Sequence, residues 1–142
     1  MTSPMRQAIV EEAISWAGTP YHHQACVKGA GTDCGMFLIG VFCGLGIVPK
    51  FDPRPYAPHW HLHRGEQKFL QELLQYADPV GEPLPGDIAI FRYGRCDAHG
   101  AVVLEWPRII HAYVGEGVVE ADASKGELAE RFAGFYRVRG IE

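Results

Sequence analysis

The strongest constraint on the fold of this chain is a change in its hydrophobic pattern at Pro85-Gly86. Before this point apolar residues recur at helical spacing. After it, short apolar segments are separated by glycine, proline or acidic residues, which is the pattern of strands joined by turns. Helices followed by strands favour an α+β fold in which helices cover one side of an antiparallel sheet. The predicted strands are residues 87–93, 99–105, 108–114, 117–121 and 135–139.

Helices are predicted in the first half of the chain. Ser3 can cap the first helix, Pro4 suits its first position, and the chain must leave the helix near Pro20. A second helix is expected over residues 34–43, capped by Thr32 or Asp33, and its apolar character on nearly every side predicts that it is buried. A short amphipathic helix is expected over residues 65–77. The apolar stripe of the first helix is Ile9, Ala13, Trp16 and Ala17.

Length and composition predict one domain over residues 1–142, because 47% of its 142 residues are hydrophobic, enough for a core. The net charge is −4 and lysine and arginine form no run, which argues against binding to nucleic acid or to an anionic membrane. The first residues lack the layout of a secretory signal. We therefore expect synthesis in a cytoplasm without a leader peptide, and four free cysteines rather than two disulfides.

Cys34 is the candidate nucleophile. It stands in the first turn of the predicted second helix, where unpaired N–H groups and the helix dipole stabilise a thiolate and can bind an oxyanion. A small apolar core residue is the alternative role. Cys43 follows nine residues later, about 180° around a helix, so it can neither form a disulfide with Cys34 nor share a metal with it.

A cysteine nucleophile needs a base, and His99 and His111 lie on two consecutive predicted strands. Their even separation places both rings on one face of a hairpin if the loop near Trp106-Pro107 holds an odd number of residues. A loop with an even number would place them on opposite faces. If the two rings share a face, one histidine could accept the Cys34 proton while the other orients its ring. Two purely structural histidines are the alternative.

Five segments, in this order and at this spacing, resemble the NlpC family of cell-wall cysteine peptidases, and the likeness extends over residues 5–122. The segments are Gly18-Thr19-Pro20-Tyr21, Thr32-Asp33-Cys34-Gly35-Met36-Phe37, Leu84-Pro85-Gly86-Asp87-Ile88-Ala89-Ile90-Phe91, Ala98-His99-Gly100-Ala101-Val102-Val103 and Ile109-Ile110-His111-Ala112.

This resemblance implies a papain-like α+β fold with N-terminal helices packed on a five- to six-stranded antiparallel sheet. It also implies that Cys34 is the nucleophile, His99 the general base and then acid, and His111 the residue that orients His99. Tyr21 matches a tyrosine near the oxyanion site, with aromatic packing as its alternative role. Asp33 matches an acidic residue that in some members meets the free amine of the stem peptide, with helix capping as its alternative.

The implied reaction is hydrolysis of an amide bond in the stem peptide of bacterial peptidoglycan, around D-glutamate and diaminopimelate, without a cofactor. The compact chain is similar to the branch encoded beside phage and gene-transfer-agent tail genes. That likeness implies tail proteins as partners and incorporation into a phage-like tail. A docking module of a tail with little or no turnover is the alternative. Gly35 departs from the serine that many relatives carry, so no hydroxyl can bind substrate there.

The run His59-Trp60-His61-Leu62-His63 lies in a predicted loop over residues 44–64. Three imidazoles on an extended segment would point the same way. A tetrahedral zinc site needs further ligands, and with no fourth ligand nearby we predict no metal site. We expect this loop to form a rim beside the Cys34 cleft, with Tyr56 and Trp60 as contact surfaces for substrate.

Overall fold

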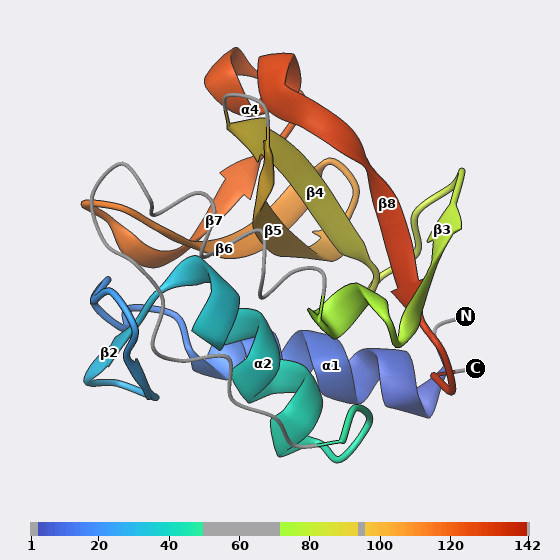
Figure 1. The fold of residues 1–142 in the computed structure, drawn as a ribbon, viewed down its shortest axis with the longest axis horizontal. Coiled ribbons are helices and arrows are strands. Elements are labelled where there is room, and N and C mark those ends of the chain that lie inside the picture. The colour runs from blue at the N-terminus through green and yellow to red at the C-terminus, as the bar shows by residue number, and fades with distance from the viewer. Residues whose placement is uncertain (1–2, 50–71, 94–95, 142) are drawn as a thin grey trace.

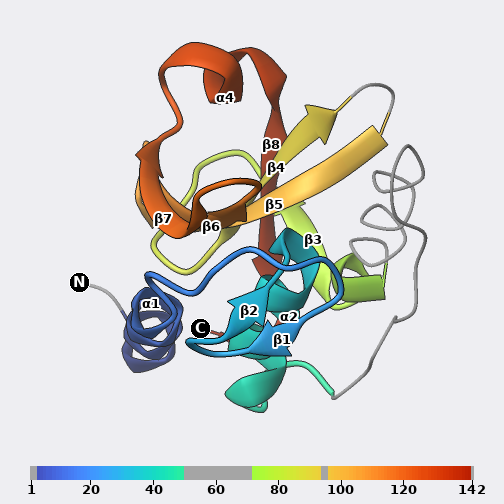
Figure 2. The same ribbon diagram turned by 90° about the vertical axis from the view of Figure 1, so that its left-hand side faces the viewer.

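The computed structural model describes residues 3–49, 72–93 and 96–141, and it has the predicted α+β fold (Figures 1 and 2). Helices α1 and α2 lie beneath the main sheet in Figure 1, and α4 lies at the opposite end of it. No helix in the described part of the chain is long and apolar enough to cross a bilayer. In chain order the elements are α1 (Pro4–Ser15), β1 (Cys26–Val27), β2 (Gly31–Thr32), α2 (Cys34–Gly44), β3 (Ala77–Val80), β4 (Ile88–Tyr93), β5 (Cys96–Glu105), β6 (Arg108–Tyr113), β7 (Gly117–Asp122), α4 (Gly126–Arg131) and β8 (Phe132–Val138).

Helix α1 begins as its sequence predicts. The Ser3 side chain accepts a hydrogen bond from the Arg6 backbone N–H at 3.2 Å, which satisfies one of the donors left over in the first turn. The apolar stripe is confirmed at Ile9, Ala13 and Trp16, which are buried. It is wrong at Ala17, which is exposed, because the helix ends at Ser15 and the helical period no longer applies there.

Helix α2 is buried on most sides, as predicted, and packs against α1, β5 and β6. Asp33 is its N-cap, which decides between the two candidate caps: one carboxylate oxygen accepts the Met36 N–H at 2.8 Å. The extended backbone of Asp33 directs the chain into the helix. The first helical residue is therefore Cys34.

Six strands form one antiparallel sheet in the order β3-β8-β4-β5-β6-β7. All five predicted strands are present, with their ends shifted by a few residues. Because side chains alternate across a sheet, they divide the core into two clusters. The cluster that includes α1 and α2 contains Ile88, Ile90, Val102 and Ile110. The cluster on the other face contains Ala89, Phe91, Val103 and Ile109, with Leu128 of α4 packed against it.

The sixth strand, β3, corrects the helix predicted for residues 65–77. Residues 72–74 are helical, but Ala77 opens β3 and pairs with Val138; residues 65–71 lie outside the described part. Pro79 restricts Asp78 to an extended conformation, which favours the strand over a longer helix. It is tolerated in β3 because this is an edge strand. The sequence pattern also did not predict the short elements β1, β2 and α4.

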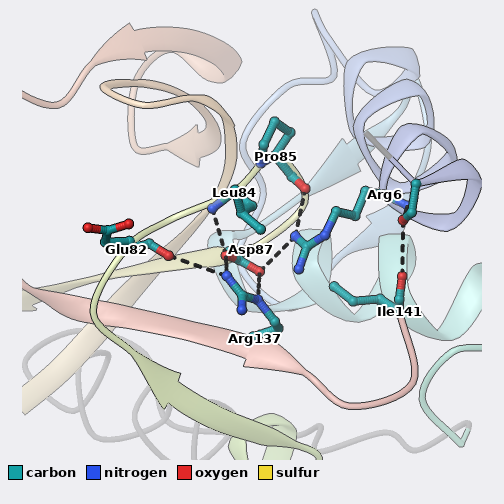
Figure 3. A network of polar contacts seen from close by, with 8 residues as sticks. Arg6, Glu82, Leu84, Pro85, Asp87, Arg137 and Ile141 are labelled. Atoms are coloured by element: carbon teal, nitrogen blue, oxygen red, sulfur yellow. Dashed lines mark hydrogen bonds and ion pairs between the residues drawn. The ribbon is translucent and has the colours of Figure 1, made fainter. Parts of the chain in front are cut away.

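Asp87, which follows the Pro85-Gly86 turn, joins α1 to the sheet (Figure 3). Its side chain is fully buried and accepts a hydrogen bond from Arg6 at 3.0 Å and two from Arg137 at 2.9 and 3.0 Å. It also accepts the Leu84 N–H at 2.8 Å. Arg6 is only 3% exposed and also donates to the Pro85 carbonyl at 2.9 Å. Breaking such a buried pair is costly.

We expect Asp87→Ala to lower the free energy of unfolding by about 3–5 kcal/mol, because it removes a fully buried carboxylate that accepts charged hydrogen bonds from both Arg6 and Arg137. Urea denaturation measures the loss. Asp78→Ala is the matched control, since Asp78 pairs with Arg139 at the surface, where ion pairs contribute less than about 1 kcal/mol. Equal losses in the two variants would show that the Asp87 network does not hold α1 on the sheet.

Candidate active site

Cys34 has the local environment that the sequence predicts for a nucleophile. It is the first residue of α2 and only 1% exposed. The Asp33 carboxylate binds two backbone segments beside Cys34. Its Oδ1 accepts the Met36 N–H, and its Oδ2 accepts the Gln24 N–H at 2.7 Å. The first-turn N–H groups and the helix dipole act on this position, and both favour a thiolate over a thiol.

The hairpin that carries His99 and His111 lacks the odd loop that the sequence argument requires. Its turn has two residues, Trp106 and Pro107, because Glu105 lies opposite Arg108. A two-residue turn by itself would place the two histidines on opposite faces of the sheet. The expectation that an odd loop length brings the two rings to one face is therefore wrong.

A β-bulge supplies the missing residue. The next pair along the hairpin is Val103 with Ile109, so Leu104 is an extra residue in β5 and the register shifts by one. This shift returns His99 and His111 to the same face. The prediction that they share a face is confirmed, although a bulge and not the loop length is the cause.

The two histidines form a hydrogen-bonded, buried pair. His99 Nε2 lies 2.7 Å from His111 Nδ1, and the ring centroids are 4.9 Å apart. The side chains are 5% and 2% exposed. One ring must donate and the other accept, because a single hydrogen bond joins two neutral imidazoles. This is the base-and-orienter geometry of a catalytic triad.

Burial keeps both rings neutral at pH 7. Desolvation lowers the pKa of His99 well below its usual 6.5, and the neighbouring His111 lowers it further. Burial lowers the pKa of His111 to about 4. An unprotonated imidazole is the form that can accept a proton, so the pair is in the correct state to deprotonate a thiol.

This burial predicts a loss of stability in acid. Above pH 6.5 His111 is neutral in both the folded and the unfolded chain and contributes no pH dependence. Below pH 6.5 the unfolded chain binds a proton that the folded pair excludes, so stability falls until the pH reaches the folded pKa of about 4. The full cost is on the order of 3 kcal/mol for His111.

Urea denaturation between pH 7 and 4 measures this loss. Carboxylates also titrate there, so the comparison is with His111→Asn, which retains a hydrogen-bonding group but does not titrate. The variant is expected to lose less stability than the parent over this range. Parallel curves for the two proteins would show that His111 is not the group responsible.

Two aromatic rings enclose the histidine pair, and sequence reasoning missed both. Phe91 of β4 lies opposite His99, with ring centroids 5.8 Å apart. Tyr113 lies 5.8 Å from His99 and 5.0 Å from His111, centroid to centroid. The signal for Tyr113 was its position two residues after His111, which puts it on the same strand face. These ring contacts contribute to the burial of the pair.

The structure gives Tyr21 and Asp33 their alternative roles. Tyr21 is half-buried, forms a β-bridge with Thr32 and packs against the core cluster that includes α1 and α2. It also lines a hollow of about 400 Å³ beside Pro20 and the turn at 115–117. Asp33 is a fully buried helix cap. The contacts of both residues with substrate remain predictions.

The remaining sequence predictions concern other cysteines and the loop. Cys26, Cys34 and Cys43 are free. Cys43 packs against the core cluster that includes α1 and α2, consistent with a packing role at the far end of α2. Trp60, Tyr56 and the histidine run 59–63 lie outside the described residues, so the predicted rim is untested.

The sequence matches no protein-family model and no curated protein sequence. Its structure, however, is similar to solved NlpC/P60 domains. A Staphylococcus aureus protein, described as similar to lipoprotein and of the NLP/P60 family, aligns with a TM-score of 0.71 and 20% identity, over 97% of this chain and 42% of its own. This chain therefore spans less than half of that protein.

Two further structures match over nearly their whole length. The NlpC/p60 domain of the peptidoglycan hydrolase SagA has a TM-score of 0.61 at 24% identity, over 92% of this chain and 96% of its own. RipD of Mycobacterium tuberculosis, described as a non-catalytic NlpC/p60 domain protein adapted to peptidoglycan binding, has a TM-score of 0.60 at 12% identity, over 97% and 98%. The chain thus has the papain-like α+β fold of NlpC/P60 domains.

Proposed function

We propose that this chain is a cysteine peptidase that hydrolyses an amide bond in the stem peptide of bacterial peptidoglycan. The observation that carries the proposal is the buried pair of His99 and His111, joined at 2.7 Å. Both strands of this pair pack against α2, the helix that begins at Cys34. A neutral, oriented imidazole and a thiol at a helix N-terminus are the parts that a thiol hydrolase needs.

The thiol and the pair must meet at the start of β5. Val102 and Ile110 point from β5 and β6 into the core around α2, so the histidines leave the sheet on its other face. A second β-bulge, at Ala98, lies directly before His99. Bulges increase strand twist and redirect side chains next to active sites. In the proposal this twist turns the His99 ring toward the sulfur of Cys34.

Acylation follows from this arrangement. His99 Nε2 is engaged by His111, which assigns its Nδ1 to proton exchange with the thiol. The Cys34 proton passes to Nδ1 as the sulfur attacks the carbonyl carbon of the scissile amide. Backbone N–H groups at the α2 start bind the resulting oxyanion. When the C–N bond breaks, His99 returns the proton to the leaving amine, and a thioester remains.

Deacylation reverses the proton path. His99 takes a proton from water as the water oxygen attacks the thioester carbon. The C–S bond then breaks, the carboxylic acid product leaves, and the thiolate of Cys34 recovers its proton from His99. His111 keeps the ring of His99 in the required tautomer throughout, and no cofactor enters the cycle.

The choice of substrate rests on the sequence resemblance and on the fold. The NlpC-like segments point to bonds around D-glutamate and diaminopimelate, and SagA, which shares the fold, is described as a peptidoglycan hydrolase. We further propose, from the likeness to the tail-associated branch, that the chain acts within a phage-like tail and contacts its tail proteins. Probing purified particles for this chain with an antibody tests that location.

The function is tested by digesting purified peptidoglycan and identifying the released fragments by mass spectrometry. Release of stem-peptide fragments that carry a new amine and a new carboxylate is expected. Cys34→Ala should release none. RipD, which shares the fold, is described as non-catalytic, so the competing function is binding alone. Sedimentation of the chain with peptidoglycan in the absence of any fragment release would favour that function and overturn the proposal.

A further inference from the structure

We infer that Tyr113 is a positioning residue, which α4 holds against the pair of His99 and His111 so that both imidazole rings keep the orientation required by the proposed reaction. The inference rests on the proposed function for the roles of the two histidines. It adds a residue that lies outside the five NlpC-like segments and a helix that the sequence pattern did not predict.

The hydrogen bond between the two histidines leaves each ring some freedom to turn. It fixes Nε2 of His99 and Nδ1 of His111, but each ring can rotate about this contact while the bond persists. In the proposed reaction Nδ1 of His99 must point at the thiol in every proton transfer, and a small error in orientation lowers the rate. Contacts with the faces and edges of the rings are therefore needed to remove this freedom.

Tyr113 contacts both rings of the pair. Its ring is tilted by 34° to that of His111, with centroids 5.0 Å apart, and is almost perpendicular to that of His99, at 86° and 5.8 Å. Both distances lie in the range that aromatic rings prefer. Tyr113 follows His111 by two residues and so shares its face of the strand. One side chain thus restrains both members of the pair.

Helix α4 holds the tyrosine ring in place. Across the ladder of β6 and β7 Tyr113 lies opposite Gly117, which has no side chain to support the ring. Glu127 of α4 provides the support: one carboxylate oxygen accepts the Tyr113 O–H at 3.1 Å, and the other accepts the Arg131 Nε–H at 2.7 Å. Arg131 also donates to the Arg92 carbonyl of β4 at 3.3 Å. These contacts connect β6 through α4 to β4, the two strands that flank β5.

The ring of Tyr113 and its hydroxyl are expected to contribute unequally. The side chains of Glu127 and Arg131 are 50% and 36% exposed, and polar contacts at the surface contribute little energy. The ring contacts are made with two buried imidazoles, where an aromatic contact is worth more. Loss of the ring should therefore have a larger effect than loss of the hydroxyl.

Three substitutions separate the ring from its support. Tyr113→Leu should lower kcat about tenfold, with KM within about twofold of the parent, because the chemical step and not substrate binding depends on the pair. Tyr113→Phe keeps the ring and should lower kcat only about two- to threefold. Glu127→Ala should match Tyr113→Phe, and the double variant should be no slower than either, because both substitutions break the same hydrogen bond.

Tyr136→Leu is the matched control. Tyr136 is a half-buried tyrosine of β8 that packs against the core cluster that includes α1 and α2, away from the histidine pair. Its kcat should equal that of the parent. All rates are measured at a temperature at which circular dichroism shows that the variants are folded.

Nitrogen-15 NMR of the histidine side chains tests the inference without any reaction. In the parent at pH 7 each ring should show one fixed tautomer, and His111 should titrate with a pKa of about 4. In Tyr113→Leu the tautomers should average, and hydration should raise this pKa towards 6.5. Tyr113→Phe should resemble the parent. The charged residues that border this side of the pair, Glu116, Glu120, Lys125 and Glu127, are the same in all three proteins.

The NMR result separates the inference from the proposed reaction. Averaged tautomers in Tyr113→Leu alone would support the positioning role even if the parent cleaved no peptidoglycan, in which case only the proposed reaction fails. If Tyr113→Leu keeps the tautomers and pKa of the parent, or loses no more kcat than Tyr136→Leu, Tyr113 only packs and the inference is wrong. Should Tyr113→Leu fail to fold, Tyr113→Phe and Glu127→Ala decide: a kcat equal to the parent in both would overturn the inference.

Discussion

Cys34→Ser is expected to lower kcat/KM for stem-peptide hydrolysis by roughly a thousandfold or more, while the chain stays folded. The substitution replaces one buried sulfur with oxygen at the first position of α2. It keeps the Asp33 cap, so the helix should form as before. A serine hydroxyl is far less acidic than a thiol, however, and a neutral histidine pair cannot convert it into an equally good nucleophile. Fragment release from peptidoglycan measures the rate, and circular dichroism measures the fold.

Cys43→Ser is the matched control for this prediction. Cys43 is a free cysteine of the same helix, partly buried at its other end. Its replacement should alter stability slightly and leave the rate of hydrolysis unchanged. If Cys34→Ser cleaves as fast as Cys43→Ser, Cys34 is not the nucleophile and its burial reflects only core packing.

His99→Ala is expected to lower kcat by about a thousandfold, and His111→Ala by about tenfold. In the proposed reaction His99 carries the proton in both half-reactions, and general acid–base catalysis typically contributes 10²–10⁴-fold. His111 acts through His99, to which it is joined at 2.7 Å, and a water molecule can partly replace an orienting partner. In the proposed reaction His111 is therefore a positioning residue, and we expect His111→Asn to recover part of the rate lost in His111→Ala.

His22→Ala controls for the loss of a histidine elsewhere, because His22 is exposed and outside the pair. It should leave kcat unchanged. Two results would contradict the assigned roles: equal losses in His99→Ala and His111→Ala, or no recovery in His111→Asn. The geometric counterpart of this prediction is a distance of about 3–4 Å between the Cys34 sulfur and a ring nitrogen of His99.

The sequence by itself was sufficient for those features that depend on local chemistry. Ser3 and Pro4 start α1, and the cap of α2 was predicted as Thr32 or Asp33, because caps satisfy N–H groups only a few residues away. The change of period at Pro85-Gly86 was enough to predict the α+β class and five strands. The candidate residues Cys34, His99 and His111 were also identified from sequence, since each stands in one of the short segments that resemble the NlpC family.

Features that depend on pairing between distant segments were decided only by the tertiary structure. The bulge at Leu104 cannot be recognised from the amino-acid composition or the hydrophobic period of β5. It depends on the register in which β5 and β6 pair over their whole length. Ala77 belongs to a strand because it pairs with Val138 of β8. This pairing overrides the helical pattern of the residues before it. The lowered pKa of His111 likewise arises from packing, since burial exists only once separate elements meet.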